Sequence, residues 1–135
     1  MAINREFIGR TYPPTRPYEV GREKIRDFAA ALGETGSDGI IAPLTFPVVL
    51  SMRAEQQVHL DPELGLDFSR VVHREQEFIP TRSIRAGDRL TVVVTVLDVA
   101  DAGGNDAVTT RADIRTVEGE HVCTAVSTMV AMAPG

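Results

Sequence analysis

The sequence contains one cysteine, Cys123, and no apolar run that approaches the roughly 20 residues needed to cross a membrane. A single cysteine cannot form an internal disulfide, and the N-terminal residues lack the pattern of a secretory signal peptide. We therefore expect a cytoplasmic protein without a membrane partner.

Excess positive charge is also missing. The net charge is −5 at pH 7, and no basic stripe with interleaved aromatics occurs, so we expect no nucleic-acid partner. The three histidines, His59, His73 and His121, are isolated and lack metal-ligand spacing. Gly103-Gly104 is not followed by a helix, as a phosphate loop would be. We expect neither a metal nor a cofactor.

The composition is that of one globular domain. The chain has 135 residues, of which 43% are hydrophobic and 24% charged. A chain of this length buries roughly two thirds of the surface that it exposes when unfolded. We expect a single domain over residues 1–135.

The stretch Ile40–Gln57, IIAPLTFPVVLSMRAEQQ, predicts a short helix at the centre of that domain. Thr45 suits the N-cap, and Pro47 suits the first turn, where a missing N–H costs nothing. The segment 46–52 is apolar on nearly every side, which predicts burial all round. It becomes polar over residues 53–57 through Arg53, Glu55, Gln56 and Gln57.

Flanking patterns predict a helix before this segment and a sheet after it. Gly21–Leu32 has helical apolar spacing, and Tyr18–Val20 fits a short strand. Leu66–Ile79 is extended but changes register, which indicates a bulge. Three further strands are predicted at Leu90–Val99, Val108–Val117 and Val122–Met132. Cys123, Ala125, Ser127 and Ala131 form a small-residue row that we expect to face the helix. The class is α+β.

Three stretches carry a resemblance to a known family: YEVGREKIRDFAAALG (18–33), IIAPLTFP (40–47) and RVVHREQEFIPTRSIRAGDRLTV (70–92). Together they resemble the MaoC-like branch of the hot-dog fold, and within it the non-catalytic A-type subunits of actinobacterial (3R)-hydroxyacyl-ACP dehydratases. The resemblance implies a curved antiparallel sheet wrapped around a central buried helix. It also implies dimers formed by extension of the sheet.

Active hydratases of that family carry a D-x-N-P-x-H run after the first helix. Here the corresponding stretch 33–39 reads GETGSDG, with Glu34 near the aspartate position, and no histidine precedes His59. The segment that leads to the central helix is also shortened. We therefore expect no catalytic residue, and if the chain is active, Glu34 and Asp38 are the candidates.

The N-terminus of the central helix is the predicted binding site. A helix N-terminus carries partial positive charge and free N–H groups that can polarise a thioester carbonyl. Pro43, Thr45, Phe46 and Val49 suit an acyl pocket and a core position equally well. For the remaining candidates, we expect Cys123 to be a small core residue, His73 to be exposed or hydrogen-bonded, and His59 and His121 to be exposed.

Three functions remain open from the sequence. The first is an acyl-thioester-binding, non-catalytic subunit of an (R)-specific enoyl or (3R)-hydroxyacyl hydratase/dehydratase, acting on ACP or CoA thioesters in a heterodimer with a catalytic hot-dog chain. The second is a self-sufficient hydratase or thioesterase using Glu34, Asp38 or Glu55. The third is a homodimer that binds an acyl group or another small ligand without chemistry.

Overall fold

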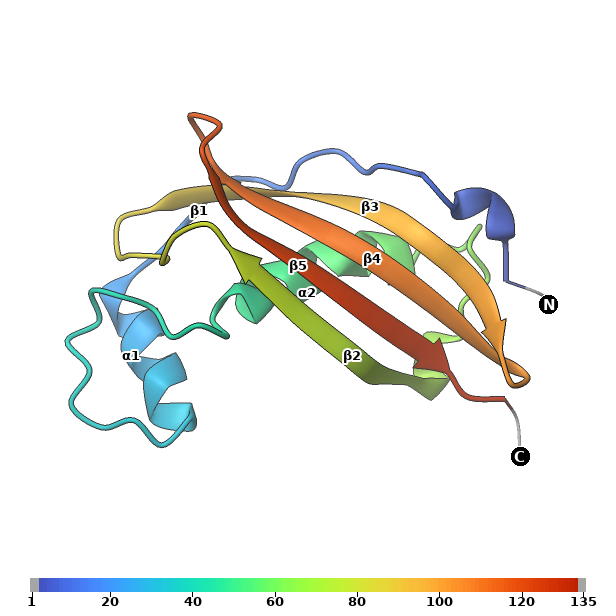
Figure 1. The fold of residues 1–135 in the computed structure, drawn as a ribbon, viewed down its shortest axis with the longest axis horizontal. Helices are drawn as coiled ribbons and strands as arrows, with labels where there is room; N and C mark the ends of the chain where they lie inside the picture. The colour runs from blue at the N-terminus through green and yellow to red at the C-terminus, as the bar shows by residue number, and fades with distance from the viewer. Residues whose placement is uncertain (1–2, 134–135) are drawn as a thin grey trace.

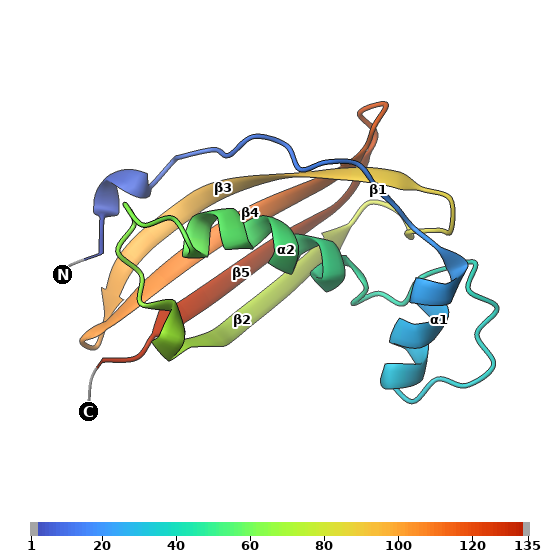
Figure 2. The ribbon, with the colours of Figure 1, turned by 180° about the vertical axis from the view of Figure 1, so that it is seen from behind.

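A computed structural model of the protein describes residues 3–133, with Ala102 described by its backbone alone. The elements in chain order are β1 (Tyr18–Glu19), α1 (Arg22–Ala31), α2 (Pro47–His59), β2 (Val71–Pro80), β3 (Arg89–Ala102), β4 (Asn105–Thr116) and β5 (His121–Ala131). The five strands form one antiparallel sheet in the order β1-β3-β4-β5-β2, which curls around α2 (Figures 1 and 2). The predicted hot-dog arrangement is confirmed.

Alternating apolar residues explain the two central strands. On β4, alternate residues are fully buried: Val108, Thr110, Ala112 and Ile114. On β3, Leu90, Val92, Val94 and Val96 are buried, and Val99 is buried with them, although strict alternation from Val96 would place it on the opposite face. A register shift between Val96 and Asp98 is the reason, because one extra residue moves every later side chain to the other face.

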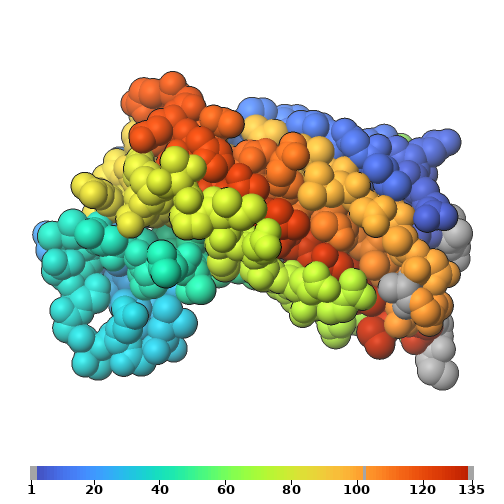
Figure 3. Space-filling view, viewed as in Figure 1, coloured from blue at the N-terminus to red at the C-terminus, as the bar shows by residue number. Residues whose placement is uncertain are grey.

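The outer strands also follow the sequence. The small-residue row of β5 faces α2, since Ser127 reaches Glu55 on that helix. The predicted irregularity in β2 is a register shift between His73 and Glu75. β2 pairs only with β5 within the described chain and forms the free margin of the sheet (Figure 3). The opposite margin is covered, because residues 9–15 run along β3 and bond to it at Val92, Val94 and Val96.

Helix α1 lies beside one end of the sheet and packs on the start of the α2 segment. Its Phe28 ring meets the Phe46 ring edge-on, with 5.4 Å between centroids. The loop that follows α1 is fastened back onto it at Gly39. This glycine has φ +76°, and a Cβ there would lie 2.6 Å from the backbone oxygen of Arg22. Only glycine fits this close approach without strain.

Two expectations about α2 are wrong. The helix is buried on one side only, and Met52 is 45% exposed, because the sheet covers a single stripe of it. The buried residues of the helix are Pro47, Leu50, Ser51, Ala54, Glu55, Val58 and His59. Thr45 is not the N-cap. Phe46 takes that position, no side chain caps the helix, and Pro47 follows in the first turn as predicted.

Candidate functional site

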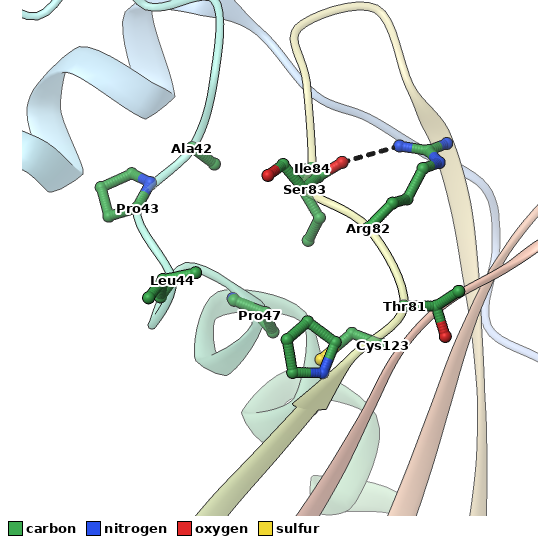
Figure 4. Close-up of a pocket in the computed structure, with 10 residues that line it drawn as sticks. Ala42, Pro43, Leu44, Pro47, Thr81, Arg82, Ser83, Ile84 and Cys123 are labelled. Atoms are coloured by element: carbon green, nitrogen blue, oxygen red, sulfur yellow. Dashed lines mark hydrogen bonds between the residues drawn. The ribbon is translucent and has the colours of Figure 1, made fainter.

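A cleft of about 190 Å³ opens at the N-terminus of α2 (Figure 4). We call it the Pro43 cleft. Its walls come from the chain that enters α2, from the segment that follows β2, and from β5. The lining residues are Ala42, Pro43, Leu44, Pro47, Pro80, Thr81, Arg82, Ser83, Ile84 and Cys123. Most of these side chains are apolar, so the cleft suits an apolar group more than a charged one.

The four residues predicted to bind substrate lie in different environments. Pro43 lines the cleft. Phe46 is fully buried against Phe28, and Val49 is partly buried against the core. Thr45 is exposed. Leu44, which the sequence did not single out, lines the cleft and is 77% exposed. Exposure of so large an apolar surface to water is unfavourable, and a ligand that covers Leu44 would remove that surface from water.

Glu34 and Asp38 both lie outside the Pro43 cleft, in the loop between α1 and α2. One carboxylate oxygen of Asp38 accepts the Ile40 N–H at 2.9 Å, and its backbone oxygen accepts two hydrogen bonds from Arg22, at 2.8 and 3.2 Å. Asp38 therefore has a structural task in shaping the loop.

Arg82 is the only charged residue of the cleft lining, and its donors are engaged. Its Nε and Nη2 donate to Glu120, and its Nη1 and Nη2 donate to Asp88. Nη1 also donates to the Ser83 oxygen (Figure 4). A guanidinium has five N–H groups, so this network uses all of them. Arg82 therefore cross-links the wall of the cleft, and no donor remains for a phosphate of a carrier.

Cys123 is the only thiol of the chain and lines the same cleft. Its side chain is buried, as predicted, and burial raises the pKa of the thiol above its ordinary value. A thiol needs a lowered pKa to act as a nucleophile at neutral pH. Cys123 consequently behaves as a small core residue.

The expectation of free N–H groups at the start of α2 is also wrong. The N–H groups of Phe46, Val48 and Val49 donate to the carbonyls of Pro43, Thr45 and Phe46, at 3.0 to 3.1 Å. Such short-range bonds are common where a helix begins. In the described chain, Leu44 and Thr45 show no hydrogen bond from their N–H groups. Backbone donors for a ligand therefore lie two and three residues before the helix, beside the cleft.

A second polar site lies inside the core, where Glu55 is fully buried against the sheet. The Ser127 hydroxyl lies 2.7 Å from Glu55 Oε1 and 2.8 Å from Gln76 Oε1. The Gln76 amide nitrogen faces the carbonyls of Val126 and Glu77, which fixes the orientation of the amide. The Ser127 hydroxyl has one hydrogen, so it can donate to Glu55 Oε1 or to Gln76 Oε1 but not fully to both, and a proton on Glu55 would supply the second hydrogen.

Burial acts in the same direction. Loss of hydration disfavours the charged carboxylate and raises the pKa of Glu55 to about 7, while the hydrogen bond from the Ser127 hydroxyl opposes this change. Thr110 Oγ1 and Glu55 Oε2 have no hydrogen-bond partner among the described residues. Glu55 is thus a carboxyl that titrates near neutral pH, but its full burial keeps it from a substrate in the Pro43 cleft.

His59 was expected to be exposed, and it is not. It forms the last turn of α2 with 3% of its surface exposed, and burial lowers its pKa to about 4, with a smaller effect from His73. His73 is exposed and its Nε2 lies 3.0 Å from the Glu75 oxygen, as expected. His121, expected to be exposed, is half-buried because it bonds to Thr81 and to Thr124.

Comparison with known proteins agrees with this geometry. The family described as "FAS1-like, dehydratase domain region" matches residues 6–125. The chain belongs to this family. A UPF0336 protein of Saccharopolyspora erythraea is 54% identical over 144 aligned positions, which cover 97% of this chain and 92% of the relative. Since 97% of 135 residues is about 131, about 13 aligned positions have no residue here, in keeping with the shortened segment inferred from the sequence.

Solved structures with a similar fold include hot-dog dehydratases. The C-terminally truncated (3R)-hydroxyacyl-ACP dehydratase complex HadBC of Mycobacterium tuberculosis is 27% identical with a TM-score of 0.74, covering 92% of this chain and 96% of that one. A MaoC-like dehydratase is 28% identical with a TM-score of 0.78, covering 94% of this chain but 42% of that one. The expected MaoC-like fold is confirmed, and this chain spans less than half of that second protein.

Neither a membrane-spanning helix nor a metal-binding cluster occurs within residues 3–133. No helix there is long and apolar enough to cross a membrane. No group of three or more His, Cys, Asp or Glu side chains in the same range lies close enough together to hold a metal ion.

Proposed function

We propose that this chain is the acyl-thioester-binding, non-catalytic subunit of an (R)-specific enoyl or (3R)-hydroxyacyl hydratase/dehydratase that acts on ACP or CoA thioesters. The observation that carries the proposal is the Pro43 cleft. Its mostly apolar lining suits an acyl group, but none of its ten lining residues has a carboxylate or an imidazole that could act as a base. Water addition to an enoyl thioester needs a base near the water and a donor for the thioester oxygen.

This chain could supply the hydrogen-bond donor for the thioester oxygen. The N–H groups of Leu44 and Thr45 are available beside the cleft, at the positive end of α2. Pro43 and Leu44 would cover the acyl group, and Phe46 and Val49 would support that wall from the core. The base would come from a partner, since Arg82 is committed to its carboxylates and Cys123 holds its proton.

A second hot-dog chain is the proposed partner, and the free margin of β2 is where it would bind. An edge strand offers a row of unpaired backbone groups to another strand. On β2, Val72 and Ile79 are 49% and 51% exposed, which adds apolar area to that row. HadBC is itself a complex, which supports a paired arrangement. The cytoplasm is the proposed compartment.

The experiment compares the chain alone with the chain bound to its partner. The purified chain should bind crotonyl-CoA or a crotonyl-ACP without hydrating it, and co-expression with a catalytic hot-dog chain should give a heterodimer with turnover. Clear hydration by the isolated chain would contradict the non-catalytic role. A stable homodimer that binds thioesters and pairs with no second chain would favour the binding-only alternative.

A matched pair of variants tests the cleft itself. Leu44→Asp puts a charge beside the acyl group at an exposed position, so it should weaken thioester binding at least tenfold, about 1.4 kcal/mol, without loss of folding. Leu32→Asp is the control, because Leu32 is also exposed, at 53%, but lies outside the cleft. Equal binding by the two variants would rule out the Pro43 cleft as the thioester site.

A further inference from the structure

A second cavity, of about 180 Å³, lies near the other end of α2, and we call it the His59 pocket. It shares no lining residue with the Pro43 cleft. Its lining residues are Met52, Gln56, His59, Phe68, Val71, His73 and Met129. They come from α2, from the segment before β2, and from the facing strands β2 and β5. The pocket is therefore built by four parts of the fold.

The walls are mostly apolar, and one of their polar atoms is a buried nitrogen. His59 is 3% exposed, and its Nε2 makes no hydrogen bond with the described residues. Its ring stacks on Phe68, with 6.2 Å between centroids and 26° between planes, so the ring is held in one orientation. An unsatisfied buried polar atom costs about 1–3 kcal/mol. That cost falls when a polar atom of a ligand reaches Nε2.

The volume of the pocket and the charge of the His59 ring limit which ligands can bind. An apolar cavity of about 150 Å³ binds benzene, so this one accepts about six carbon atoms. Burial keeps the His59 ring neutral at neutral pH. A charged ligand would lose its hydration without gaining an opposite charge from that ring. A neutral imidazole nitrogen donates or accepts depending on the tautomer, and a hydroxyl group can pair with either form.

We propose that the His59 pocket binds a neutral alcohol whose apolar body has about six carbons, with its hydroxyl paired to Nε2 of His59. Met52, Phe68, Val71 and Met129 surround the apolar body. Gln56 and His73 complete the lining. The proposal concerns a separate site and does not depend on thioester binding in the Pro43 cleft.

The test uses two probes of equal size and different polarity. Cyclohexanol and methylcyclohexane have the same number of heavy atoms, and only the first has a hydroxyl. Titration of the full chain, followed by the NMR amide signals of Val71 and Met129, should give saturable cyclohexanol binding at least tenfold tighter than methylcyclohexane, or about 1.4 kcal/mol. Equal binding of the two probes, or no saturation, would overturn the proposal.

Three variants assign the site. His59→Phe keeps an aromatic ring against Phe68 but removes the nitrogen, so cyclohexanol should bind no better than methylcyclohexane. Val71→Trp fills the cavity from an edge strand and should abolish binding of both probes. His121→Phe, a histidine on β5 outside the pocket, should change neither. Unaltered cyclohexanol binding by either His59→Phe or Val71→Trp would contradict the assignment. If His59→Phe does not fold, Val71→Trp alone still tests it.

Discussion

The Ser127 hydroxyl on β5 lies 2.7 Å from Glu55 Oε1 on α2, and this buried contact joins the central helix to the sheet. The same hydroxyl lies 2.8 Å from Gln76 Oε1 on β2. The trio therefore links three elements through one oxygen atom. A proton on Glu55 would make both contacts favourable, and burial raises the pKa of Glu55 to about 7, which favours that proton.

Glu55→Gln should stabilise the protein at alkaline pH. The pKa of Glu55 is raised from 4.5 to about 7, so the folded state holds the proton more tightly than the unfolded state. The stability of the native protein therefore falls as pH rises from about 4.5 to about 7, by about 3 kcal/mol in total, and stays low above that range. The neutral glutamine lacks this loss.

Urea unfolding of both proteins at about pH 4.5 and about pH 8 measures the effect. The difference in unfolding free energy between Glu55→Gln and the native chain should increase by up to about 3 kcal/mol between these pH values. The lowered pKa of His59 acts in the opposite direction, but it is present in both proteins and cancels. Glu63→Gln, at an exposed glutamate, is the control. A difference that is independent of pH would show that folding does not raise the pKa of Glu55.

Arg82→Met should lower stability by about 1–3 kcal/mol at neutral pH, because it leaves Asp88 without its cation. The Arg82 guanidinium and the Arg85 N–H hold the pKa of Asp88 below its ordinary value, against the opposing effect of burial. The stability that these two groups add through Asp88 is therefore present above the pKa of Asp88 in the unfolded chain. It is lost as the pH falls through the pKa of Asp88 in the folded protein. Thermal unfolding should show the two proteins converging in acid. A constant difference across pH would argue against this ion pair as the cause.

Gly39→Ala should destabilise the loop that enters α2 more than Gly36→Ala does. Both glycines have positive φ, +76° and +85°, so alanine is strained at each. Only at Gly39 would the new Cβ also meet the backbone oxygen of Arg22, at 2.6 Å. We expect a cost of about 1 kcal/mol at Gly36 and at least about twice that at Gly39, measured by chemical denaturation. Equal costs would mean that the Arg22 backbone moves aside.

Glu34→Ala and Asp38→Ala separate the catalytic and non-catalytic interpretations. Both side chains belong to a loop outside the Pro43 cleft. The assembled heterodimer should retain its turnover with either change, and Asp38→Ala should cost some stability because it removes the acceptor of the Ile40 N–H. A loss of turnover beyond about a hundredfold would make the residue an acid or base of this chain.

The sheet and α1 could be predicted from sequence because their apolar residues keep a regular period. The period of two in β4 and the helical spacing of α1 each indicate one buried face. The bulge in β2 was also predictable, since its apolar residues change register. The register shift that buries Val99 in β3 was not, because valine suits either face of that strand.

The buried polar residues Glu55 and His59 were harder to predict, because residues of these types usually lie at the surface. Glu55 and His59 follow Ser51 at intervals of four, so the three share a face of α2, beside the face of Leu50, Ala54 and Val58. That spacing was the available signal. The partner that makes the burial of Glu55 tolerable, Ser127, lies 72 residues further along the chain and cannot be paired with it from the sequence alone.

The free margin of β2 has a consequence for the chain before it finds a partner. An exposed strand edge with apolar side chains can pair with the same edge of other copies and start aggregation. At Val72 and Ile79, β2 has half-exposed apolar side chains and no charge that would oppose such pairing. We therefore expect the isolated chain to scatter light on concentration, and Ile79→Lys, a gatekeeper charge at that edge, to prevent this while also blocking assembly.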